Sequence, residues 1–167
     1  MNRSRGAVAA LVIIGLLVGC ESWKKDHPKD MSKAGGMQGK SLYDRLGGEP
    51  AIRAVVDDFV PRAANDAKVN FTRKGVPGAE WQATPENVEK LKIRLVQFIG
   101  QATGGPQKYV GKDMKTAHKG MKITSAEFDA AAADLKASLD KLKVPAREQS
   151  ELMAVVASTK NDMVEVK

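Results

Sequence analysis

Residues 84–106, TPENVEKLKIRLVQFIGQATGGP, have the pattern of a single amphipathic helix with a marked beginning and a marked end. Thr84 is a suitable N-cap, Pro85 fits the first helical position, and Glu86 places a negative charge near the positive end of the helix dipole. Apolar side chains then recur every three or four residues, at Val88, Leu91, Leu95, Phe98 and Ile99. The Gly-Gly-Pro sequence at 104–106 ends the pattern. The stretch therefore predicts a helix with one buried face.

Helical spacing continues on the N-terminal side of this stretch. Residues 42–46 form a short apolar face that Gly47 and Gly48 end. Residues 52–60 repeat the period more strongly, and we expect Pro61 to break or kink that helix, because proline lacks an amide donor and clashes with the preceding turn. Residues 65–83 are expected to form a loop.

The C-terminal side has the same character. Residues 107–123 are expected to be weakly structured, and residues 124–127, TSAE, predict a capping box that opens another helix. That helix carries Phe128, Ala131, Leu135, Leu139 and Leu142, and a last helix carries Leu152, Val155, Val156 and Met163. No segment shows the alternation of a strand, so the sequence predicts an all-α fold.

The N-terminus has the features of a bacterial lipoprotein signal peptide. Two arginines precede an apolar run, residues 7–18, that is too short to cross a bilayer as a helix. It ends at LVGC, residues 17–20, which resembles a lipobox. We therefore expect residues 1–19 to be removed, Cys20 to be acylated, residues 20–40 to form a flexible tether, and residues 41–167 to form the domain. The predicted location is the cell envelope, on its periplasmic or cell-surface side, and Glu21 favours the outer membrane.

Composition limits the other classes of function. The chain has 167 residues, a formal net charge of +7 and 5% aromatic residues. Its lysines are spread along the chain without interleaved aromatics, so we expect no nucleic-acid partner. Cys20 is the only cysteine, which excludes a disulfide within one chain. The sequence also contains no Cys/His metal cluster, no glycine-rich phosphate loop and no serine with a usable base.

His118 is the one histidine of the predicted domain, because His27 falls in the tether. It is flanked by Met114, Ala117 and Met121 in a short segment between glycines. Neutral imidazole is a common axial ligand of haem iron. A lone histidine in a loop is more often a surface residue, so composition alone leaves both roles open.

Several short motifs, in order and spacing, resemble the group 1 truncated haemoglobins. They are SLYDRLGG at 41–48, VDDF at 56–59, ATGGP at 102–106, YVGKDMKTAHKG at 109–120 and IT at 123–124. The resemblance covers residues 41–165. It implies a truncated globin, a two-over-two helical sandwich, that binds haem b with His118 as the proximal iron ligand. The second ring nitrogen of His118 is expected to donate to a backbone carbonyl or to Thr116.

The resemblance also implies the residues that line the haem pocket. The expected lining side chains are Phe59, Val60, Phe71, Leu91, Leu95, Phe98, Ile99, Met114 and Ala117. The candidates for contact with the haem propionates are Lys92, Arg94, Lys115 and Lys119.

The distal side departs from the family pattern. Val60 stands where the family typically has a tyrosine, and Leu91 and Leu95 stand where it usually has a glutamine or another polar group. Loss of one hydrogen bond, worth about 0.5–1.5 kcal/mol, should weaken the retention of dioxygen. Gln97, Gln101 or a residue of the 72–83 loop could supply a substitute donor.

The resemblance implies a protein that binds dioxygen, NO or CO at haem iron. The alternative is a haem-dependent detoxifying enzyme, a nitric oxide dioxygenase or a peroxidase-like protein, and a third reading is a haem-free helical envelope lipoprotein. The sequence has no flavin or NAD motif, so an external reductant is expected as a partner, together with the membrane lipid that holds acylated Cys20.

Overall fold

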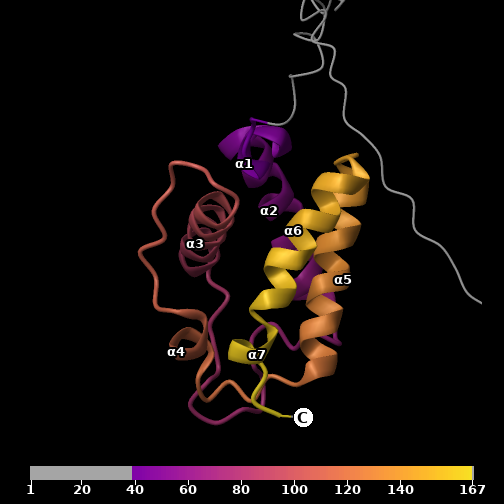
Figure 1. Cartoon of the computed structure of the whole chain (residues 1–167). Coiled ribbons are helices and arrows are strands. Elements are labelled where there is room, and N and C mark those ends of the chain that lie inside the picture. Colours follow the sequence, from indigo (N-terminus) through magenta and orange to yellow (C-terminus); the bar gives the residue numbers. More distant parts are fainter. Residues whose placement is uncertain (1–38, 167) are drawn as a thin grey trace, which may run out of the picture. The chain divides into compact units, whose positions relative to one another are not determined.

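The computed structural model describes residues 39–166, so the predicted signal peptide, Cys20 and most of the tether lie outside the described residues. Seven helices occur in residues 39–166 (Figure 1). They are α1 (Leu42–Leu46), α2 (Gly48–Asn65), α3 (Pro85–Ala102), α4 (Met114–His118), α5 (Ser125–Lys141), α6 (Ala146–Ser158) and α7 (Lys160–Met163). This stretch has one isolated bridge, between Thr124 and Val166, and no strand. The all-α prediction is confirmed.

Local capping explains where the main helices begin. The Thr84 hydroxyl accepts from the backbone N–H of Asn87 at the start of α3. Thr124 and Glu127 form a reciprocal capping box at the start of α5, as the sequence predicts. Gly47 ends α1 with φ at +98°, a left-handed conformation that glycine adopts without a steric penalty.

Three local predictions need correction. The helix over 52–60 is not broken at Pro61 but continues to Asn65, because buried Val60 and Ala63 hold its last turn in the core. The expected last helix is divided at Thr159, whose hydroxyl bonds to the carbonyl of Val156. The weakly structured stretch contains the short helix α4.

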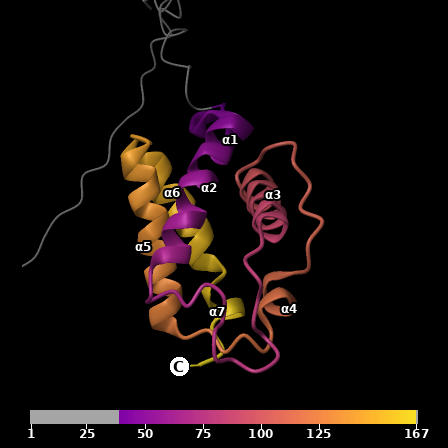
Figure 2. The same ribbon diagram turned by 180° about the vertical axis from the view of Figure 1, so that it is seen from behind.

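The core lies where α2 packs against both α3 and α5. α6 packs on α5, and the pairs α2–α3 and α5–α6 form the two-over-two sandwich (Figures 1 and 2). The buried core side chains are Ile52, Val55, Val56, Val60, Val96, Ile99, Leu135, Leu139 and Leu152. Val56 and Leu139 have no exposed surface. Leu142, expected on the apolar face of α5, is 40% exposed at the end of that helix.

α4 lies apart from this core. It packs against α7, and both views place the two short helices at the end of the domain that is opposite α1 (Figures 1 and 2). No helix among residues 39–166 is both long enough and apolar enough to span a membrane.

Candidate functional site

His118 is the last residue of α4, and the helix itself orients its ring. Asp113 caps α4 by accepting the N–H of Thr116 at 2.9 Å, and hydrogen bonds from Thr116 lower the pKa of this carboxyl. His118 Nδ1 lies 2.8 Å from the carbonyl oxygen of Met114, one turn earlier. A carbonyl only accepts, so Nδ1 donates its N–H to it, and Nε2 is the ring nitrogen left for a metal. Of the two partners expected from the sequence, the structure has the backbone carbonyl.

The chain after α4 is fixed by residues 164–166, which we call the C-terminal strap. The carboxylate of Glu165 accepts the N–H groups of Gly120 and Lys122 at 2.8 and 2.7 Å, and these bonds lower its pKa. The N–H groups of Glu165 and Val166 both donate hydrogen bonds to the carbonyl of Ile123. The strap therefore supports the segment that carries His118 from a part of the chain far away in sequence.

The inward face of α4 is apolar and only partly covered. Met114, Ala117 and His118 are half-buried, as is Met121 just after the helix. α3 presents a similar stripe, in which Leu91, Leu95 and Phe98 are half-buried. Such faces have apolar surface left to cover, and α3 and α4 lie on the same side of the domain (Figures 1 and 2).

The other predicted pocket residues divide into two groups. Val60 and Ile99 lie in the buried core, at 2% and 5% exposed. Phe59 and Phe71 are half-buried at its edge. Phe71 packs edge-on against Trp81 with ring centroids 5.5 Å apart. This contact between the two aromatic side chains stabilises the 65–83 loop.

The four candidate propionate residues differ in their present partners. Lys92 forms an ion pair with Asp57 at 2.8 Å, and Arg94 donates to the side-chain oxygen of Gln97 at 3.0 Å. Lys115 and Lys119 are exposed and form no ion pair with any acid of residues 39–166. The structure therefore leaves Lys115 and Lys119 with free ammonium groups beside His118.

The candidate donors Gln97 and Gln101 use their side-chain oxygens elsewhere, whereas their amide N–H groups donate to no group of residues 39–166. Gln97 is the partner of Arg94, and the side-chain oxygen of Gln101 accepts the backbone N–H of Tyr109 at 2.8 Å. In the 72–83 loop, Arg73 is 6% exposed and pairs with Glu127 at 3.0 Å. No local sequence pattern predicts this pair, because Arg73 and Glu127 are 54 positions apart.

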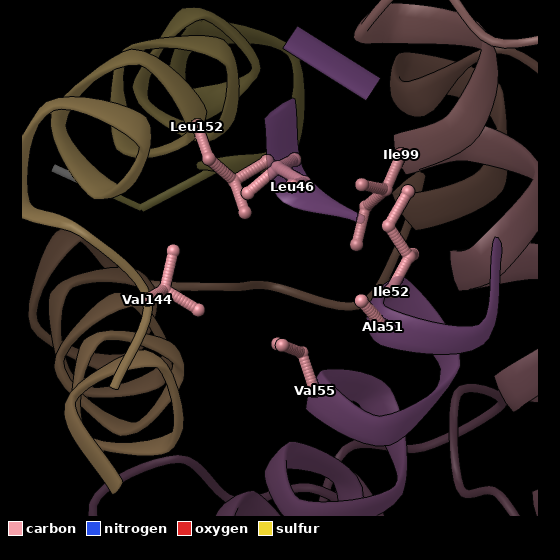
Figure 3. A pocket seen from close by; sticks show the side chains of 7 residues that line it. All are labelled: Leu46, Ala51, Ile52, Val55, Ile99, Val144 and Leu152. Carbon is pink, nitrogen blue, oxygen red and sulfur yellow. The ribbon is translucent and has the colours of Figure 1, made fainter. Parts of the chain in front are cut away.

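A small apolar cavity lies between α1, α2, α3, α6 and the segment that joins α5 to α6 (Figure 3). Its lining is entirely aliphatic: Leu46, Ala51, Ile52, Val55, Ile99, Val144 and Leu152. Its volume is about 10 Å³, the lower limit for one water molecule, and its lining offers water no polar partner. Ile99, expected in the haem pocket, lines this cavity.

Comparison with known proteins gives a consistent family. The sequence pattern of the bacterial-like globins matches residues 41–165. The group 1 truncated haemoglobin of Tetrahymena pyriformis is 30% identical over 125 residues, which cover 75% of this chain and 95% of that protein. A group 1 truncated haemoglobin of Mycolicibacterium paratuberculosis is 33% identical over 117 residues, covering 70% of this chain and 79% of that protein.

Solved structures agree with the sequence matches. The crystal structure of the Tetrahymena pyriformis truncated haemoglobin in its Fe(III) form has a TM-score of 0.64 at 30% identity, covering 75% of this chain and 98% of that one. The 2/2 haemoglobin of a Synechococcus species, solved in the cyanomet state with covalently attached haem, has a TM-score of 0.63 at 27% identity and the same coverage.

Proposed function

This chain belongs to the group 1 truncated haemoglobins, and on that premise we propose that His118 is the proximal ligand of its haem b iron and that the protein reversibly binds a diatomic gas at the cell envelope. Haem is the cofactor of this family, and globins bind gases such as dioxygen and NO. The observation that carries the proposal is the geometry of His118, whose Nδ1 is held by the Met114 carbonyl.

The described residues fit a haem. A neutral imidazole binds a metal through its unprotonated nitrogen, and the Nδ1–carbonyl bond makes Nε2 the nitrogen available for this. A flat apolar ring needs apolar walls, and the partly covered stripes of α3 and α4 supply them. When bound, haem supplies an iron atom with a coordination position open to a gas.

The chain's own residues set three properties of the site. The carbonyl of Met114 keeps the imidazole in one orientation, with Nε2 left for a metal. The side chains of Leu91, Leu95 and Phe98 give α3 an apolar, half-buried face. None of these three can donate a hydrogen bond to a gas. We therefore propose a pocket that binds dioxygen but releases it quickly.

The apolar distal side also favours a gas-binding role over nitric oxide dioxygenase or peroxidase-like chemistry. Dioxygenation profits from a polar pocket that retains dioxygen, whereas Val60, Leu91 and Leu95 are all apolar. A reversible carrier still needs ferrous iron, so we propose an external electron donor. The chain itself has no flavin or nicotinamide motif.

We further propose that Cys20 carries a lipid anchor and that the signal peptide is removed. The support is the lipobox-like sequence at residues 17–20 after a short apolar run. Cells fed radiolabelled palmitate should label the wild-type protein but not the Cys20→Ser variant. Labelling that persists in the variant contradicts the anchor.

The proximal assignment is tested by haem binding to the chain without residues 1–19. We expect a Soret band in the wild type, its loss or a marked shift in His118→Ala, and its return when imidazole is added to His118→Gly. His27→Ala is the matched control, because it removes the other histidine of the chain. An unchanged spectrum in His118→Ala would falsify the assignment.

A further inference from the structure

The net positive charge of the domain is concentrated beside His118. Residues 39–166 contain 20 Lys and Arg and 17 Asp and Glu, and residues 112–122 alone contain four Lys and one Asp. The rest of the domain is therefore balanced, with 16 basic and 16 acidic residues. The four lysines are all exposed, and we call them the α4 lysine face: Lys112, Lys115, Lys119 and Lys122.

These lysines have free charges. None of the four pairs with an acid of residues 39–166, whereas Lys90, Lys136 and Lys160 each form an ion pair elsewhere on the domain. The nearby acids are used by the backbone. Asp113 caps α4, and Glu165 accepts two amide N–H groups. Asp113 and Glu165 together carry two negative charges against the four lysines, so the α4 lysine face projects a net positive field into solvent.

The α4 lysine face lies next to the proposed haem ligand. Lys115 and Lys119 are one helical turn apart and exposed, while Met114, Ala117 and His118 form the half-buried side of the same helix. A helix with its side chains is about 10–12 Å across. A molecule docked on the lysines is thus separated from the His118 ring by roughly one helix.

The position of α4 in the domain also matters. α1, where the chain enters the described domain, lies at the opposite end from α4 in both views (Figures 1 and 2). The α4 lysine face is therefore separated from the point of chain entry by the length of the domain. A protein partner can reach these lysines without contacting α1.

We propose that the α4 lysine face is the docking site for an acidic one-electron carrier protein that reduces the haem iron. The inference rests on the proposed function, since it needs haem on His118. One electron passes from the reduced carrier to the ferric iron, so the carrier is oxidised by one electron and the iron becomes ferrous. No bond is formed or broken. Charge complementarity steers the encounter and makes its rate dependent on salt.

The test uses the haem-loaded chain and a reduced acidic flavodoxin as the probe. A variant with glutamine at all four lysines of the face is compared with a control that has Lys68→Gln, Lys74→Gln, Lys108→Gln and Lys143→Gln, four exposed lysines that likewise form no ion pair with an acid of residues 39–166. Both lose four charges from exposed positions, so they differ only in where the charge is removed. Reduction is followed by stopped flow under CO, and binding of oxidised flavodoxin is measured separately by calorimetry.

We expect the face variant to be reduced about tenfold more slowly than wild type in ~10 mM salt and to differ little in ~1 M salt. Its affinity for oxidised flavodoxin should fall in parallel, and the control should stay close to wild type. Lys112→Gln with Lys122→Gln spares the two candidate propionate residues. This double variant should still slow reduction about threefold at low salt if the field of the face matters.

Equal losses in the face variant and the control overturn the proposal, as does a wild type that flavodoxin neither binds nor reduces. Binding to anionic phosphatidylglycerol vesicles is measured for the same proteins. If the face variant binds vesicles more weakly than wild type but binds flavodoxin and accepts electrons from it equally well, the proposal is overturned in favour of a lipid surface. A wild type without a Soret band contradicts the proposed function itself. If the wild type has a normal Soret band and dithionite reduces its haem, the proposed function stands. The flavodoxin measurements then test the docking site alone.

Discussion

A hydrogen-bond donor introduced at Leu95 should slow the release of dioxygen. Leu95 lies on the half-buried stripe of α3, one turn after Leu91, and it packs against the edge of the core. Glutamine has a similar length and adds an amide N–H on that side of the helix. We expect Leu95→Gln to provide the distal donor that the wild-type sequence lacks.

The size of the effect follows from one hydrogen bond. A net gain of about 0.5–1.5 kcal/mol corresponds to dissociation that is roughly two- to thirteenfold slower. The substitution also removes a partly buried apolar side chain, which should cost about 1 kcal/mol of folding stability. Release of dioxygen can be measured by stopped flow, with CO added to trap the vacated site.

Two controls separate the donor from other effects. Leu95→Met keeps the apolar character and about the same volume, so its release rate should stay near that of wild type. Ile93→Gln adds the same amide to α3 at a position that is 38% exposed, on another face of the helix. Equal release rates in Leu95→Gln and Ile93→Gln would refute the reasoning. Slow release in the wild type would show that a donor is already present.

Three further predictions concern the fold and are measured by urea or thermal unfolding followed by circular dichroism. Leu139→Ala should cost about 2–5 kcal/mol, because Leu139 is fully buried where α2 and α5 meet. Gly105→Ala should cost about 1–3 kcal/mol, because the new Cβ would lie 2.4 Å from the Tyr43 ring and push it away from Gln107. Asp58→Asn should reduce the loss of stability in acid. Hydrogen bonds from Lys141, Arg62 and Ser138 hold the pKa of Asp58 well below its usual range. The stability that this carboxylate provides is therefore complete above about pH 4 and is lost as the pH falls further.

Each of these has a matched control. Leu142→Ala removes the same atoms from a side chain that is 40% exposed and should cost far less than Leu139→Ala. Gly39→Ala adds a methyl group with nothing within 4 Å and should be neutral. Asp162→Asn removes one carboxylate from an exposed position, and its acid unfolding should follow that of wild type. A control that behaves like its test variant would contradict the corresponding account.

The sequence predicts those parts of the fold that depend on neighbouring residues. Thr84 and Thr124 cap their helices through residues three positions further on, so both starts can be read directly from the sequence. Pro61 shows the limit of such reasoning. Its local preference predicts a break or a kink, but the long-range packing of Val60 and Ala63 keeps the last turn helical.

The candidate site shows the same division. The bond from His118 to the Met114 carbonyl spans one helical turn and could be anticipated, although α4 is too short to give a periodic signal. The pairing of Arg73 with Glu127 joins distant parts of the chain, and only the fold brings them together. The packing of the helices likewise determines which basic side chains form ion pairs, as Lys92 does with Asp57.

The C-terminal strap has a consequence for the order in which the protein matures. Translation delivers Glu165 to the growing chain 47 residues after His118. Until then the amides of Gly120 and Lys122 lack the carboxylate that binds them, and α4 lacks α7 as its support. The histidine therefore gains its fixed surroundings only after residue 165 has been made and has folded back. We expect stable capture of the cofactor to follow the synthesis of the C-terminal strap and not that of α4 alone.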